Sequence, residues 1–161
     1  MRITFLFVLL ITQCLAQAGT LTGRVVRVTD GDTIVVLDSA NAQHKIRLTG
    51  IDAPERKQAF GTKSKEPLSG SVAGKFVVVE YSKRDRYQRI LGKVLLSNED
   101  INLEQIRAGL AWHYKQYQDE QTSNDRELYS EAEVEAREAR RGLWHDPEPV
   151  PPWEYRNLKR K

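Results

Sequence analysis

The sequence predicts an α+β domain in which short β-strands come first and helices follow. Two observations support this order. Between residues 21 and 96, stretches rich in Val, Ile and Thr alternate apolar and polar residues and are separated by short turns. After residue 101, apolar residues recur at the three- and four-residue spacing of helices instead. Short strands at this spacing fit a small barrel or a strongly twisted sheet.

Five strands are expected in the first part of the chain. The segment from Leu21 to Leu37 is interrupted at Asp30-Gly31, which predicts two strands around a turn. The remaining three strands are expected at residues 44–52, 75–82 and 89–96, with the sequences HKIRLTGID, KFVVVEYS and RILGKVLL.

Helical patterns take over at Asn102. This residue and Gln105, three positions later, resemble a capping pair at the start of a helix, and Gly109 weakens its end. A longer helix is expected over residues 124–141 and ends at Gly142. Its apolar side is formed by Leu128, Ala132, Ala136, Ala139 and Leu143.

Two further segments are less regular. Residues 60–75 are a weaker candidate for a helix, because Pro67 and Gly70 disfavour helical structure. The segment from Val150 onward, VPPWEYRNLKRK, combines prolines with a basic end and is expected to be extended and partly mobile.

The first eighteen residues differ from the rest of the chain. An early Arg, the apolar run ITFLFVLLI and small residues before Gly19 form the pattern of a cleavable secretory signal. The apolar run is shorter than the roughly 20 residues needed to span a bilayer, so we expect export to the periplasm or the extracellular space without stable membrane association. The expected organisation is a signal peptide at 1–18, one domain at 19–147 and a Pro-rich, basic tail at 148–161.

Charge and cysteine content limit the possibilities further. Removal of residues 1–18 takes away the only cysteine, Cys14, so disulfides would not stabilise the exported chain. It also lowers the formal net charge from +3 to +2, which only mildly suggests a polyanionic partner. The sequence contains no nucleophile elbow and no Gly-rich phosphate loop. The histidines His44, His113 and His145 match no common zinc-ligand spacing.

Four acidic residues lie at predicted strand ends or turns, where short side chains can converge: Asp30, Asp32, Asp52 and Glu55. Calcium binds several oxygen atoms from carboxylates, backbone carbonyls and water, and two Asp residues plus a carbonyl would supply part of such a set. The alternative is that Asp30-Gly31-Asp32 is a turn sequence and nothing more. Taken alone, this tripeptide favours the turn.

Two arginines, Arg47 and Arg89, lie on the third and fifth predicted strands. Guanidinium groups bind phosphate oxygens and can neutralise the charge that accumulates during attack at phosphorus. Arg47 precedes Asp52 by five residues, so it would point to the opposite side of a regular strand unless a bulge or twist intervenes. Both arginines could equally be solvated residues or ion-pair partners, and periodicity alone does not bring them together.

Five motifs follow one another along the chain: VTDGDTIVVL, IRLTGIDAPER, RDRYQRILGKVLL, IRAGLAW and EAREARRGLWHDP. Their order and spacing resemble those of the staphylococcal nuclease, or thermonuclease, family over roughly residues 21–147. The resemblance implies a five-stranded OB-type β-barrel with three α-helices. It also implies cleavage of DNA and RNA with calcium (Ca2+) as cofactor.

The resemblance further implies roles for individual residues. Asp32 and Asp52 match the family's calcium-ligand carboxylates, Ala53 matches the position that offers a backbone carbonyl, and Asp30 matches an acid just behind the ligands. The residues that match the catalytic positions are Glu55 as general base and Arg47 and Arg89 as the arginines that hold the scissile phosphate.

Substrate contacts are the least regular part of the resemblance. Arg86 and Tyr87 match residues that contact the terminal phosphate of the nucleotide. Tyr117 matches one base-stacking tyrosine, whereas Lys115 stands where the family can have another, and Tyr114 would replace it after a local shift. The alternative is that these aromatic side chains pack at a helix end.

The leading hypothesis is a secreted, calcium-dependent nuclease of low sequence specificity that acts as a monomer. It would cleave DNA and RNA, with single strands preferred, and leave 3′-phosphate ends. The alternative is a catalytically inactive OB-type nucleic-acid-binding module. A third possibility is an accessory protein of a secretion or DNA-transfer system, whose activity would depend on a partner.

Overall fold

The computed structural model describes residues 19–159, so the predicted signal peptide at 1–18 lies outside the described residues. None of the helices between residues 19 and 159 is both long and apolar enough to cross a membrane. The elements are, in order, β1 (Gly19–Asp30), β2 (Thr33–Leu37), β3 (Gln43–Leu48), β4 (Ile51–Asp52), α1 (Gly61–Val72), β5 (Phe76–Arg84), β6 (Ile90–Leu96), β7 (Glu99–Asp100), α2 (Ile101–Arg107), β8 (Trp112–His113), η1 (Lys115–Glu120), α3 (Ser123–Glu138), η2 (Gly142–His145) and α4 (Pro152–Leu158).

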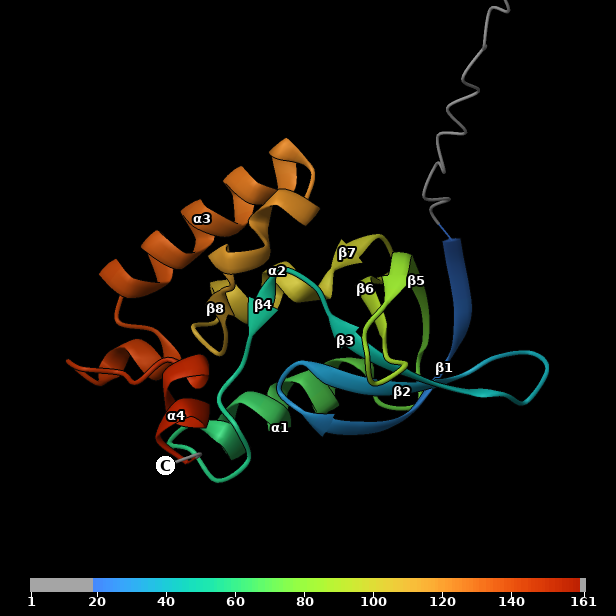
Figure 1. Ribbon diagram of the computed structural model, residues 1–161, viewed down its shortest axis with the longest axis horizontal. Coiled ribbons are helices and arrows are strands. Elements are labelled where there is room, and N and C mark those ends of the chain that lie inside the picture. The colour runs from blue at the N-terminus through green and yellow to red at the C-terminus, as the bar shows by residue number, and fades with distance from the viewer. Residues whose placement is uncertain (1–18, 160–161) are drawn as a thin grey trace, which may run out of the picture.

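Five strands close into a barrel (Figure 1). Antiparallel pairing gives the order β3-β2-β1-β5-β6, and β7 continues beyond β6. The barrel closes because β3 also pairs with β6, in parallel, with Ile46 opposite Ile90. The prediction of a five-stranded OB-type barrel in an α+β domain is therefore confirmed.

Branched aliphatic side chains fill the barrel, as the alternating strand pattern requires. Fully buried members of this core include Val25, Ile34, Ile46, Val79, Ile90 and Val94. Helix α1 packs against β1, α2 against β6, and α3 against α2. In Figure 1, α3 and α4 lie to one side of the barrel, with the short pair β4 and β8 between them and the strands.

The turn between β1 and β2 carries Asp32 to one end of the barrel. Bulges in β1, between Val25 and Arg27 and between Val28 and Asp30, bend the strand just before this turn. Only glycine fits at position 31, since a Cβ there would collide with the side chain of Ser64. Gln105 of α2 donates to the carbonyl of Gly31 at 2.7 Å and so fixes the turn against the helices.

The expected strand over 44–52 is divided in two. β3 ends at Leu48, Gly50 adopts a left-handed φ of 72°, and β4 resumes at Ile51 and pairs with β8 instead of the barrel. Because the alternation of sides restarts after this turn, Arg47 and Asp52 can face each other across a five-residue separation.

Helix ends and faces differ in detail from the prediction. The N-cap of α2 is Asp100, whose carboxylate accepts from the backbone N–H of Leu103 at 3.1 Å, so the assignment of the cap to Asn102 was wrong. Asn102 is buried and instead accepts from the N–H of Val94. In α3 the buried face is formed by Tyr129, Ala132, Glu133 and Ala136, while Leu128 and Ala139 are exposed.

The segment after Val150 is not extended, which corrects the sequence prediction. Residues 152–158 form α4, with Pro152 in the first turn, where its fixed φ and missing N–H are compatible with a helix. The helix forms because Pro152 is buried and Trp153 packs on Trp112 and Tyr114. Likewise α1 forms despite Pro67, with Leu68 and Val72 fully buried.

Candidate active site

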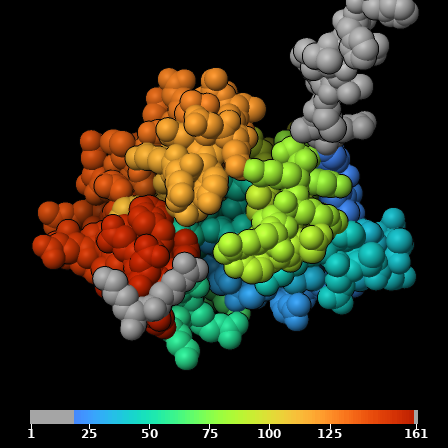
Figure 2. Space-filling view, viewed as in Figure 1, coloured from blue at the N-terminus to red at the C-terminus, as the bar shows by residue number. Residues whose placement is uncertain are grey.

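A recess opens on the face of the molecule shown in Figure 2. The teal part of the chain, around residue 50, is visible in it between the yellow-green β5–β6 hairpin, the orange segment after β8 and the red C-terminal helix. At this end of the barrel lie five side chains that we call the strand-end cluster: Asp32, Arg47, Asp52, Glu55 and Arg156.

Arg47 bridges the two predicted calcium-ligand carboxylates. Its Nη1 lies 2.7 Å from Oδ2 of Asp32, and its Nη2 lies 2.7 Å from Oδ1 of Asp52. Arg47 reaches both because it pairs with Thr33 across β2 and β3 and precedes the turn that leads to β4. Asp32 and Asp52 are buried, and 13% of the Arg47 side chain is exposed.

Asp32 is held by neutral donors as well as by Arg47. It accepts from the hydroxyl of Thr33 at 2.9 Å and from the backbone N–H of Ala53 at 2.8 Å. The latter bond joins the β1–β2 turn to the segment after β4. Ala53 therefore lies beside Asp32 through its backbone N–H, whereas the resemblance implied a role for its carbonyl.

Arg156 of α4 binds the other side of Asp52. Its Nη2 lies 2.8 Å from Oδ2 and its Nη1 donates to Oδ1 at 3.2 Å. The same Nη1 donates to Oε1 of Glu55 at 2.9 Å. The predicted general base thus joins the cluster through a residue 101 positions away in the sequence.

The protonation equilibria reflect this concentration of charge. Burial, followed by the negative charge of Asp32, raises the pKa of Asp30 to about 6, and one buried oxygen of Asp30 has no hydrogen-bond partner in the described residues. Burial also raises the pKa of Asp52, against the lowering effect of Arg156 and Arg47. Burial lowers the pKa of Arg156, but its hydrogen bonds to Asp52 and Glu55 outweigh this and raise it. The two guanidinium groups in contact with Asp52 favour its ionised form.

The carboxylates of Asp32 and Asp52 are oxygen donors of the kind that a hard divalent cation prefers. A carboxylate offers about four acceptor positions, and Asp32 and Asp52 each use three of them in the contacts above. The unpartnered oxygen of Asp30 lies in the same acidic environment. Within residues 19–159, however, no group of three or more Asp, Glu, His or Cys side chains could hold a metal ion. Calcium would therefore need oxygens from the backbone and water in addition to Asp32 and Asp52.

The second predicted phosphate-binding arginine has a different environment. Arg89 lies in the hairpin tip, residues 85–89 between β5 and β6, where its Nε donates to Asp85 at 2.7 Å. Its guanidinium also lies 5.6 Å from the ring centre of Tyr87, and that of Arg86 lies 4.8 Å from the same ring. Arg86, Tyr87 and Arg89 thus form one group, separate from the contacts of the strand-end cluster.

The predicted base-contact tyrosines lie near α4. Tyr114 and Tyr117 pack edge to face at 5.0 Å, and Trp153 stacks on Tyr114 at 5.4 Å with an interplanar angle of 10°. Burial, followed by the charge of Asp52, raises the pKa of Tyr114. Lys115 binds Glu133 at 2.9 Å instead. A groove of about 300 Å³ runs along this surface, lined in part by Tyr114 and Trp153.

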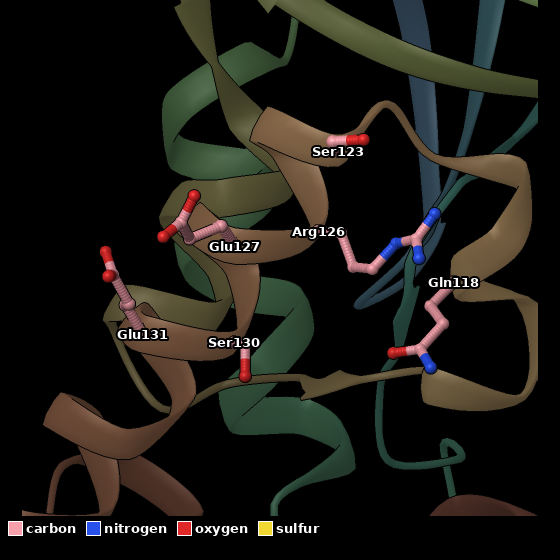
Figure 3. Close-up of a pocket in the computed structure, with 6 residues that line it drawn as sticks. All are labelled: Gln118, Ser123, Arg126, Glu127, Ser130 and Glu131. Atoms are coloured by element: carbon pink, nitrogen blue, oxygen red, sulfur yellow. The ribbon is translucent and has the colours of Figure 1, made fainter.

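A second hollow, shown in Figure 3, lies on α3 and η1. Its lining residues are Gln118, Ser123, Arg126, Glu127, Ser130 and Glu131. It contains none of the predicted site residues, and Figure 3 shows Glu127 and Glu131 pointing outward from the helix. We therefore place the chemistry at the strand-end cluster and not at this hollow.

Sequence reasoning missed Arg156, which contacts both Asp52 and Glu55. A usable pattern was present. In PPWEYR, a proline at the first helical position precedes a tryptophan and, three residues later, an arginine, which is the spacing of one helix face.

Fold and site together define an OB-type barrel protein with buried carboxylates and arginines at one end of the barrel. The family model described as Staphylococcal nuclease homologue matches residues 45–146, and the chain belongs to the staphylococcal nuclease family. Membership in this family supports a phosphodiester-cleaving hydrolase. Asp32 and Arg156 lie outside the matched range.

Several relatives are similar over most of their length. A protein of Escherichia coli named an uncharacterized endonuclease is 49% identical over 138 residues, covering 85% of this chain and 86% of the relative. One of the same name from Haemophilus influenzae is 43% identical over 139 residues, covering 86% and 75%. A protein of Shigella flexneri named micrococcal nuclease is 38% identical over 148 residues, covering 86% and 82%.

Proposed function

We propose that this protein is an exported, monomeric, calcium-dependent nuclease that hydrolyses phosphodiester bonds in DNA and RNA with low sequence specificity. The observation that carries the proposal is the pair of buried carboxylates, Asp32 and Asp52, bridged by Arg47 beside Glu55. Such a concentration of buried charge is costly for folding, and charged groups of this kind cluster at functional sites.

The chain's own groups supply the chemistry of hydrolysis. Glu55, whose side chain is 41% exposed, accepts a proton from the water that attacks phosphorus. Arg47 and Arg89 neutralise the charge that builds up on the phosphoryl oxygens. Calcium, held by Asp32, Asp52 and the carbonyl of Ala53, would add positive charge for the same purpose. Breaking the bond from phosphorus to O5′ leaves a 3′-phosphate and a 5′-hydroxyl.

Substrate preference follows from the residues that would contact the phosphates and the bases. Phosphate contacts carry no sequence information, so little base specificity is expected. Arg86 and Tyr87 are exposed and suited to a terminal phosphate, and the rings of Tyr114 and Tyr117 provide a surface on which unpaired bases can stack. These features support a preference for single strands.

The test is digestion of single-stranded DNA and RNA by the chain from Gly19 onward, with calcium, with magnesium and with chelator. Glu55→Gln should reduce turnover by about 10²- to 10⁴-fold, the usual range for a general base. The matched control is Glu131→Gln, on the exposed surface of α3. The products should accept a 3′-label only after phosphatase treatment.

Several outcomes would contradict the proposal. Near-normal activity of Glu55→Gln would remove this residue from the mechanism, and equal activity in chelator would remove calcium. Tight binding without cleavage in every metal would favour the inactive binding module. The proposal of export depends on the pattern of residues 1–18 alone. N-terminal sequencing of the protein isolated from its cells tests it, and a chain that still begins at Met1 would refute it.

A further inference from the structure

Helix α4 is attached to the loop that carries Glu55. The hydroxyl of Tyr155 donates to the carbonyl of Lys57 at 2.9 Å. Gln58 donates to the carbonyl of Val150 at 2.6 Å and accepts from the backbone N–H of Glu55 at 3.1 Å. The segment from Val150 is therefore hydrogen-bonded to the residues on the C-terminal side of the predicted general base.

The other face of α4 is fixed by aromatic packing. Trp153 lies between Tyr114, on which it stacks, and Trp112, which it meets edge to face at 5.5 Å. Trp112 is buried and pairs with Asp52 across β8 and β4. Since α4 is anchored both on this pairing and on the loop after β4, its Arg156 is placed with little freedom between Asp52 and Glu55.

Arg156 adds positive charge but does not neutralise all of the carboxylates or occupy all of their acceptor positions. Three carboxyl groups, of Asp32, Asp52 and Glu55, contact two guanidinium groups, so negative charge remains in excess for a divalent cation. Asp52 also keeps one acceptor position after its three contacts. The arginine can therefore act together with a bound cation at this carboxylate.

We propose that Arg156 is a positioning residue for phosphodiester hydrolysis: it holds the carboxylate of Glu55 against Asp52, so that residues 150–158 belong to the active site. This inference rests on the proposed nuclease function. The bidentate contact with Asp52 fixes the guanidinium plane, and the bond from Nη1 to Glu55 then orients the base. Without Arg156, Glu55 would sample rotamers that do not face the attacking water.

The opposite possibility is that α4 blocks the site and must leave before catalysis. Arg156 would then compete with a cation for Asp52, and Trp153 would compete with a base for Tyr114. The two possibilities predict opposite signs: loss of the Arg156 contacts lowers turnover if the residue positions Glu55, and raises it if the residue blocks the site.

The experiment measures kcat and KM on a single-stranded oligonucleotide with calcium for wild type, Arg156→Gln, Arg156→Lys, Glu55→Gln and the double variant. Arg156→Gln should lower kcat by about 10- to 100-fold, as is usual when a partner that orients an active-site ligand is lost, with a smaller change in KM. Arg156→Lys should recover part of the loss because it keeps the charge but not the fork. On the Glu55→Gln background, Arg156→Gln should cause no further loss.

Arg107→Gln is the matched control, since Arg107 is half-exposed and paired only locally with Glu104 on α2. Thermal unfolding of each variant sets an assay temperature at which all are folded. Undiminished or increased turnover in Arg156→Gln would overturn the inference, and so would an equal loss on both backgrounds. A wild-type chain that does not cleave would refute the proposed nuclease function. A wild-type chain that cleaves, together with an equally active Arg156→Gln variant, would refute only the role of Arg156.

Discussion

Two regions of the molecule each present a predicted phosphate-binding arginine, but they hold it in different ways. In the strand-end cluster, Arg47 is 13% exposed and bound to two buried carboxylates on different strand ends. In the hairpin tip, Arg89 is 26% exposed and bound to Asp85, four residues earlier in the same turn. Arg47 is thus fixed by the tertiary fold, whereas Arg89 is fixed only by its own hairpin. We expect the loss of Arg47 to reduce the stability of the fold. We expect the loss of Arg89 to reduce activity and to leave stability nearly unchanged.

The largest effect should come from Arg47→Met. Removing one partner of a buried ion pair typically costs about 3–5 kcal/mol, because the remaining charge is left without compensation. Here both Asp32 and Asp52 would lose a partner, so the free energy of unfolding should fall by about this amount in chelator. Urea unfolding measures it, and a loss below about 1 kcal/mol would contradict the tertiary role of Arg47.

The β4–β8 pair, which carries Asp52 of the strand-end cluster, and the hairpin tip should also differ in their response to acid. Burial lowers the pKa of His113, which lies on β8 opposite Ile51. Its Nε2–H donates to Gln121 at 2.8 Å, and its buried Nδ1 has no hydrogen-bond partner among residues 19–159. Because the pKa of His113 is lower in the folded chain than its unfolded value near 6.5, the unfolded chain binds a proton first as the pH falls. The fold is therefore at full stability above pH 6.5 and loses stability below it.

Urea unfolding at pH 7.5 and 5.5 tests this for wild type and His113→Asn. The acid-induced loss should be smaller in the variant, by about 1.4 kcal/mol per unit of pKa difference. In the hairpin tip, burial raises the pKa of Asp85, but hydrogen bonds from Arg89 and the backbone outweigh this and lower it. Its contribution is present above 3.8 and lost only at lower pH, so Asp85→Asn should not alter the response between pH 7.5 and 5.5. Equal acid sensitivity in wild type and His113→Asn would contradict the assignment.

The smallest change in stability should come from Arg89→Met. Partly exposed pairs of this kind contribute about 0–1 kcal/mol, so the unfolding free energy should change by no more than that. Turnover should fall nevertheless, since Arg89 is proposed to contact the phosphate. A stability loss as large as that of Arg47→Met would erase the distinction between the two regions.

The difference between residues fixed by a local turn and residues fixed by tertiary contacts explains which features the sequence could predict. The hairpin tip and the β1–β2 turn are local, so their turn residues and alternating strands placed Asp32 at a strand end and Arg89 within one residue of the start of β6. The resemblance to a family then supplied the grouping of Asp32, Asp52 and Arg47 that periodicity could not. The relation of Arg47 to Asp52 depends on the left-handed Gly50, whose conformation a strand pattern does not reveal.

Arg156 was missed for a related reason. Its partners lie 101 and 104 residues away, and two prolines beside a basic end resemble a solvated tail. The helix is stabilised there by distant parts of the chain, including Trp112 and Tyr114, which provide a surface for Trp153. The cap of α2 shows the same limit on a smaller scale, because both Asp100 and Asn102 are good capping residues, and burial of Asn102 against β6 decides between them.

The parallel pairing of β3 with β6 has a consequence for how the protein refolds. Closure of the barrel joins distant parts of the chain, and long-range closure is slow because the entropy of the intervening loop must be lost first. The bonds from Arg156 to Asp52 span a still longer stretch. During refolding from denaturant, circular dichroism should therefore recover before enzymatic activity, and the lag between the two would time the last step of assembly.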